Sequence, residues 1–186
     1  MKKGFIFLMF VAFSIAATAQ STAIRTIQTN GITMVETLND DGTDLVKRPY
    51  RWFAGMAEAD VEAVALEMAQ LEAYATISRV IENAVKTESE SKTFVLNGEV
   101  SKALTSAWEQ MSFSIQKACE PFGEAESYYD SNKNMYHVTA KVGIRGDRYV
   151  KLLNGAKNIQ PEGLKGDNLK QFNEVNDAII DAAKGN

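Results

Sequence analysis

The sequence predicts an α+β fold, in which a small antiparallel sheet packs against a long Ala-rich helix and a second helix, with a further helix at the C-terminus. Three observations predict this class. Residues 57–84 are dense in Ala, Glu, Leu and Met, which favour helix. Residues 100–118 place apolar side chains at helical spacing on one face. Residues 135–145 alternate apolar and polar side chains, as a strand with one buried face does.

The N-terminus has the pattern of an export signal, residues 1–19. Two lysines precede an apolar run over 4–16, and Ala17-Thr18-Ala19 follows, so we expect cleavage between Ala19 and Gln20. The run is shorter than the ~20 residues of a membrane-spanning helix. No cysteine stands at the cleavage point, so we expect no lipid there. These features predict a chain exported to the periplasm, the outer-membrane periphery or the medium, with no transmembrane segment after cleavage.

Charge and cysteine content narrow the classes of partner. The formal net charge is −4, and loss of two lysines with the signal lowers it to −6. An acidic chain without a basic block is a poor ligand for nucleic acid and for anionic lipid. Cys119 is the only cysteine, which excludes an internal disulfide. Three interpretations of Cys119 are open: a buried apolar residue, a link between subunits, or a reactive thiol.

The first part of the chain is expected to contain a flexible leader and a strand. Residues 20–30 are rich in Ser and Thr and show no core pattern, whereas residues 32–38 alternate as a strand does. Asn39-Asp40-Asp41-Gly42 predicts a turn. The α+β domain is expected over residues 31–157.

The long helix over 57–84 carries apolar side chains on two faces rather than one. In its first half the face comprises Val61, Val64, Ala65, Met68, Leu71 and Ala75. In its second half it comprises Ala69, Ala73, Ile77, Val80 and Ala84, turned well away from the first. A helix of this kind is expected to be buried on more than one side, with the sheet on one and another helix or a subunit on the other.

The second half of the chain is predicted to continue with helix, hairpin and helix. Residues 87–93 are polar and fit either an exposed edge strand or a loop, and Pro121 ends the helix over 100–118. Residues 124–130 and 135–145 form a hairpin, with Tyr136, Val138, Ala140, Val142 and Ile144 on its buried face. Asp147 is expected to cap a short helix that ends at Gly155.

The C-terminal part, residues 158–186, is predicted to be a linker and an amphipathic helix. Pro161 lies among polar turn-forming residues over 158–166. The helix over 169–183 carries an apolar face that includes Phe172 and Ile179. This face either docks on the core or is offered to a partner.

Cys119 and His137 are the only thiol and imidazole, and a dyad between them is the one candidate for nucleophilic catalysis. Cys119 precedes Pro121 near a helix end, not at a helix N-terminus where its pKa would fall. His137 falls on the polar side of a strand. One His and one Cys do not make a zinc site, which needs three or four such ligands. We therefore expect no catalytic residues, no metal and no cofactor.

Three acidic or charged motifs fit ordinary structural roles better than a metal, adhesion or catalytic site. Asp40, Asp41 and Asp44 lack the alternation and terminal Glu of an EF-hand loop, which favours a turn. Arg145-Gly146-Asp147 spells an adhesion tripeptide but also fits the end of a strand and a helix start. The glutamates of the long helix favour a solvated face over acid–base chemistry, and they are Glu58, Glu62, Glu67 and Glu72.

The densest aromatic group is Tyr50, Trp52 and Phe53, before Gly55. It fits core packing at the helix entrance, or a patch for a partner or a saccharide. The candidate interaction surface comprises Trp52, Phe53, Phe172 and Ile179.

A family resemblance extends over residues 50–153. Trp52-Phe53-Ala54-Gly55-Met56-Ala57 runs into the alanine-rich helix, Tyr128-Tyr129-Asp130 comes later, and Met135-Tyr136-His137-Val138-Thr139-Ala140-Lys141-Val142 follows. This pattern resembles the LPP-twenty (LPP20) lipoprotein family, which includes the flagellar outer-membrane protein FlgP and is similar to the N-terminal domain of FlgT. The resemblance implies helices packed on one antiparallel sheet and a non-catalytic envelope role, often in assemblies at the outer membrane. It supplies no catalytic residues. The family's lipoproteins carry a lipidated Cys where this chain has Gln20, and the helix over 100–118 is longer than the family pattern implies.

Together these features predict a non-catalytic exported envelope protein that acts by self-association or by binding another envelope protein. Two alternatives remain: a secreted thiol hydrolase that uses Cys119 and His137, and a carrier that holds a small ligand between sheet and helix.

Overall fold

The computed structural model describes residues 30–90 and 96–185. The predicted signal, its cleavage site at Ala19 and Gln20, and the leader up to residue 29 lie outside the described residues. Asn30 already belongs to the first strand. None of the helices in the described ranges combines the length and apolar character that a membrane crossing requires.

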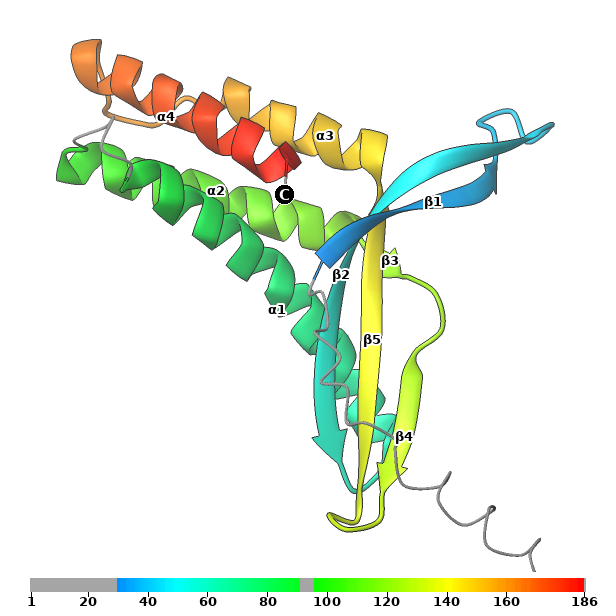
Figure 1. Ribbon diagram of the computed structural model, residues 1–186. Coiled ribbons are helices and arrows are strands. Elements are labelled where there is room, and N and C mark those ends of the chain that lie inside the picture. Colours follow the sequence, from blue (N-terminus) through cyan, green and yellow to red (C-terminus); the bar gives the residue numbers. More distant parts are fainter. Residues whose placement is uncertain (1–29, 91–95, 186) are drawn as a thin grey trace, which may run out of the picture.

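The sheet is antiparallel and has five strands: β1 (Asn30–Leu38), β2 (Leu45–Ala59), β3 (Glu120–Pro121), β4 (Glu126–Asp130) and β5 (Met135–Arg145). Its order is β1-β2-β5-β3, and β4 pairs with the first part of β5. The helices gather on one side of this sheet (Figure 1). The predicted α+β class is confirmed, and β5 has the predicted bounds.

The strand β2 extends where the sequence predicts the start of a helix. Residues 57–59 pair with β5, and the aromatic residues Trp52 and Phe53 lie within the same long strand. Ala and Glu favour helix only weakly, by less than about 1 kcal/mol per residue. Continuous pairing with β5 outweighs that preference, so the helix begins at Glu62 rather than at Ala57.

The long helix α1 (Glu62–Ser89) packs on the sheet through its alanines. Ala65, Ala69 and Ala73 are fully buried, and Gly55 of β2 lies against the backbone of Ala69 and Ala73. Thr76 Oγ1 donates a hydrogen bond of 3.0 Å to the Ala54 carbonyl, which ties helix to strand. The helix also continues to Ser89, so the start of the polar segment over 87–93 is helical, and residues 91–93 lie outside the described residues.

Helix α2 (Gly98–Ala118) runs back along the second half of α1. The Asn97 side chain caps it by accepting hydrogen bonds from the backbone N–H groups of Glu99 and Val100, at 3.0 and 2.9 Å. Ser78 and Ser112 hydroxyls lie 2.9 Å apart between the two helices. The predicted second helix is therefore confirmed, with an earlier start.

The chain ends in α3 (Gly146–Gly155), a short 3₁₀ turn η1 (Ala156–Asn158) and α4 (Gly166–Gly185). The apolar face of α4 is buried in the main core, together with α1, α2 and α3. A buried amide holds this core together: Asn176 accepts from Trp108 Nε1 at 3.0 Å and donates to the Ala156 carbonyl at 2.9 Å. Of the two alternatives for the C-terminal helix, the structure shows docking on the core.

The core has two unequal parts. The larger lies among the helices and one end of the sheet, and contains Phe53, Trp108 and Phe172. The smaller lies between the first half of α1 and the other end of the sheet, and consists of alanines with Val138. The first half of α1 therefore has the sheet on one side, while its second half packs against α2 and α4 (Figure 1).

Candidate functional site

The first half of α1 exposes a row of apolar side chains on the side away from its buried alanines. Leu71 is 63% exposed and Met68 47%, and Val61 and Val64 are exposed to a similar degree. With the exposed Ala75, these residues recur at alternating spacings of three and four, as on one seam of a coiled coil. We call Val61, Val64, Met68, Leu71 and Ala75 the α1 seam.

A groove of about 800 Å³ opens between the second half of α1 and helix α2. Buried Ile81 and Trp108 contribute to its lining, and so do the exposed side chains of Glu82 and Phe113. Many of its other lining residues are small and carry hydroxyl groups, among them Ser78 and others on α2. We call this feature the α1–α2 groove. The sequence predicts a ligand pocket between sheet and helix in the carrier alternative, whereas this groove lies between two helices.

The β1–β2 hairpin exposes a second apolar surface. It reaches beyond the helices (Figure 1), so the side of its strands that continues the buried face of the sheet meets no helix there. Ile32, Met34, Leu38 and Leu45 are all more than half exposed, up to 70% at Leu45. The apolar and polar residues of β1 alternate as predicted, but the apolar side chains are exposed rather than buried in the core.

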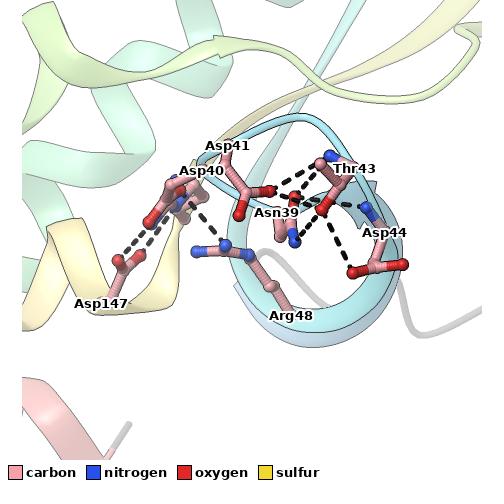
Figure 2. Close-up of polar contacts among 8 residues, drawn as sticks. Asn39, Asp40, Asp41, Thr43, Asp44, Arg48 and Asp147 are labelled. Carbon is pink, nitrogen blue, oxygen red and sulfur yellow. Dashed lines mark hydrogen bonds and ion pairs between the residues drawn. The ribbon is translucent and has the colours of Figure 1, made fainter.

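The turn of this hairpin uses its acids internally. The backbone N–H of Thr43 donates to Asn39 Oδ1 and Asp41 Oδ1, at 2.9 and 3.1 Å, and Gly42 has a positive φ of 75° (Figure 2). Hydrogen bonds from Thr43 hold the pKa of the Asp41 carboxyl below its usual value. Within the described ranges, no group of three or more His, Cys, Asp or Glu side chains is arranged to hold a metal ion. The turn interpretation is confirmed.

The adhesion tripeptide is engaged within the molecule. Arg145 pairs with Asp147 of its own tripeptide and, at 3.0 Å, with Asp40 of the hairpin turn (Figure 2). Asp147 is not the N-cap, because α3 begins at Gly146 and its N-cap is Arg145, so the expected cap is wrong. The Arg145 guanidinium instead lowers the pKa of Asp147 to about 2. The Arg145–Asp40 ion pair links the start of α3 to the hairpin turn.

The structure does not bring Cys119 and His137 together. Glu120, next to Cys119, pairs with Gly143 of β5, which lies ~20 Å along the strand from His137. Burial raises the pKa of the Cys119 thiol to about 12, the opposite of an activated nucleophile. His137 stacks on Tyr128, and its Nδ1 lies 3.0 Å from Glu58 Oε1. Of the interpretations of Cys119, burial in the core is the one the geometry supports.

The glutamates of the predicted long helix do not converge. Glu58 lies on β2 and pairs with Lys133 and His137, whereas Glu72 pairs with Arg79 on α1. Glu62 and Glu67 are exposed, which agrees with a solvated face.

The four residues of the candidate interaction surface require correction. Phe53, Phe172 and Ile179 are at most 1% exposed, because the sheet and α4 bury them in the main core. Of the four, only Trp52 is partly exposed: its Nε1 donates to Thr33 Oγ1 at 3.0 Å, and Lys141 lies over its ring. The α1 seam and the hairpin surface are exposed apolar regions that this candidate surface did not include.

The signal for the α1 seam is present in the sequence, since its members already share one face of a helical wheel. The groove carries no comparable signal, because it depends on how far apart α1 and α2 pack. Comparisons with protein-family models, with curated proteins and with solved structures found no match to this chain. The exposed surfaces of the molecule itself are therefore the basis for a functional proposal.

Proposed function

We propose that this chain is a non-catalytic, exported envelope protein that acts by binding protein, including further copies of itself. The observation that carries the proposal is the α1 seam. Contiguous exposed apolar side chains on a folded domain are typical of protein–protein contact sites.

Burial of the α1 seam would contribute favourably to association. Full burial of a Val, Leu or Met side chain contributes about 1.5–3 kcal/mol, and the large seam residues are about half exposed. Covering four of them therefore yields several kcal/mol before the cost of association. The hairpin surface adds a second, separate region where a partner can bury apolar area.

Two features of the sequence support the envelope role. The N-terminal pattern is that of a cleaved export signal. The resemblance of residues 50–153 to the LPP20 family implies a non-catalytic role in assemblies at the outer membrane, and Gln20 argues for an unlipidated member. Export is tested by cell fractionation and by sequencing the N-terminus of the exported chain, which should begin at Gln20.

The binding proposal is tested by co-purification of two differently tagged copies of the chain from residue 20 onward. We expect the copies to co-purify, and Met68→Glu with Leu71→Glu to abolish the association. Val150→Glu is the matched control, since Val150 is an exposed apolar residue on helix α3. If the seam variant associates as strongly as the control, the seam does not carry binding.

The α1–α2 groove favours a second candidate function, a small-ligand carrier. Its volume of about 800 Å³ is within the range of small-molecule sites, about 300–1,000 Å³. Native mass spectrometry of the purified protein tests this function. A bound small molecule that is lost on Thr105→Trp, a substitution within the groove lining, supports the carrier, and an unliganded chain opposes it.

A further inference from the structure

We infer that two copies of this chain pair about a two-fold axis near Ala75, with their α1 helices antiparallel and the α1 seam of each copy seated in the α1–α2 groove of the other. This inference rests on the proposed self-association and specifies its geometry.

The seam and the groove lie on one continuous face of α1. The spacing of the seam continues beyond Ala75 without interruption, and the residues that continue it line the groove. These residues are Ser78, Glu82, Val85 and Ser89. One helix face is therefore a row of exposed apolar side chains in its first half and the wall of a groove in its second half.

A face of this kind is complementary to itself under a two-fold rotation. An isologous interface requires that each patch meet a matching patch on the same surface of the partner. Met68 precedes Ala75 by seven residues and Glu82 follows it by seven, which is ~10 Å on either side. In an antiparallel pair centred on Ala75, the seam of each copy therefore lies at the same height along the helix as the groove of the other copy.

The residues at the crossing point are small. Ala75 is exposed and presents little side chain, so two α1 helices can approach closely there. Ser78, the next position of the row, is also small, and its hydroxyl contacts Ser112 and Gln116 of α2. Seam residues at alternating spacings of three and four are also the knobs that helix pairing by interdigitation requires.

The charges beside the seam fit the antiparallel arrangement. Glu72 and Arg79 lie on the same side of the seam, three residues before and four residues after Ala75. Within one chain they form an ion pair at 2.5 Å. The two-fold places Glu72 of each copy beside Arg79 of the other, so the same residues can pair between copies at both ends of the crossing. Exposed pairs of this kind fix register more than they add affinity.

Engineered cysteines test the geometry in a Cys119→Ser background. The proposed two-fold axis brings the Ala75 Cα atoms of the two copies close together, and a disulfide can bridge only Cα atoms within ~7 Å. We therefore expect Ala75→Cys to form a disulfide-linked dimer. We also expect Met68→Cys to cross-link with Glu82→Cys when the two variants are mixed, and not with itself. Val150→Cys is the control for chance collision.

A charge exchange tests the register independently. Glu72→Arg and Arg79→Glu each place like charges together in a homodimer, whereas the mixture pairs opposite charges at both ends. We expect the amount of mixed dimer to exceed the amount of either homodimer roughly fivefold. The pair within each single variant stays repulsive in the mixture, so the preference reports only contacts between copies.

The inference and the proposed function fail in different ways. Copies that co-purify but cross-link Met68→Cys with itself, or not at all at these positions, overturn the inference and leave self-association standing. Copies that do not co-purify overturn both the inference and the self-association on which it rests. A small molecule that occupies the groove in the purified dimer also overturns the inference.

Discussion

At the scale of single residues, Gly55 decides how closely α1 approaches the sheet. A Cβ atom at this position would lie 2.1 Å from the Ala73 backbone nitrogen and 2.2 Å from the Ala69 carbonyl oxygen. Backbone atoms cannot move aside as the end of a flexible side chain can, so the helix itself would have to shift. The buried alanines and this glycine together set the spacing of the smaller core.

We predict that Gly55→Ala lowers the free energy of unfolding by about 3 kcal/mol or more, since overpacking against rigid neighbours is at the upper end of its usual cost. Urea denaturation followed by circular dichroism measures this change. Gly98→Ala is the control, because a Cβ there meets no atom within 4 Å. Equal stability of the two variants would contradict the close approach.

Asn176 is predicted to be a second sensitive position. Asn176→Ala removes the acceptor of Trp108 Nε1, which leaves this buried donor unsatisfied, and one of two donors to the Ala156 carbonyl, which keeps the hydrogen bond from the Ile159 N–H. We expect a loss of about 1–3 kcal/mol, measured by urea denaturation. Asn168→Ala, which loses only exposed hydrogen bonds to Asn97 and Glu99, should cost less than about 1 kcal/mol. Similar losses for the two variants would count against this role.

Cys119 is predicted to be inert in the native protein. Its pKa of about 12 and its burial keep the thiol protonated and inaccessible at neutral pH. Iodoacetamide at pH 7.5, followed by mass spectrometry, should label the thiol only after denaturation in urea. Rapid labelling of the native chain would revive the reactive-thiol interpretation.

Residue types alone predicted part of this picture. The sequence identifies Cys119 as the only cysteine and offers burial as one of its interpretations. It did not identify Gly55 or Asn176 as contact points, because each depends on a partner element that the local sequence does not specify. The same limit explains why the sequence leaves both core packing and an interaction surface open for Phe53, Phe172 and Ile179.

At the scale of elements, the β1–β2 hairpin is tied to the start of α3 through charge. Asp40 lies within 3.2 Å of both Arg48 and Arg145, and Arg145 also pairs with Asp147 (Figure 2). These contacts join a projecting ribbon to the first turn of a helix more than 100 residues later in the chain. These long-range contacts therefore help to hold the hairpin in position.

The Arg145–Asp147 pair predicts a pH dependence of stability. The hydrogen bond from Arg145 lowers the folded-state pKa of Asp147 from 3.8 to about 2, so its contribution is present above pH 3.8. It is lost as the pH falls from about 3.8 through about 2, because the unfolded chain then binds a proton that the folded chain does not. Asp147→Asn should show a smaller drop in urea midpoint between pH 5 and pH 2 than the unmodified protein. An identical drop would contradict the pairing.

Elements with strong periodicity were predicted well from the sequence, and β2 was not. The strand β5 and helix α2 each have one clear face, and tertiary contacts agree with their local preference. Residues 57–59 have a local preference for helix, but pairing with β5 holds them in a strand. The conflict between local preference and long-range pairing moved the start of α1 by five residues, from Ala57 to Glu62.

At the scale of the whole molecule, the described chain buries one face of its sheet and leaves several apolar regions exposed, among them the α1 seam and the hairpin surface. The sequence indicated that α1 needs a second neighbour, because its first-half face points away from the second. The structure shows that no described element of the same chain covers Met68 and Leu71. The self-association that we propose through α1 would cover these side chains, and the hairpin surface would remain free for another partner.

The most direct test is the native mass of the chain from Gln20 to Asn186, measured by light scattering on a sizing column over a range of concentrations. The account predicts a dimer, and a return to the monomer mass for the Met68→Glu, Leu71→Glu variant with an unchanged circular dichroism spectrum. A unique monomer mass for the unmodified chain at every concentration would contradict self-association through α1.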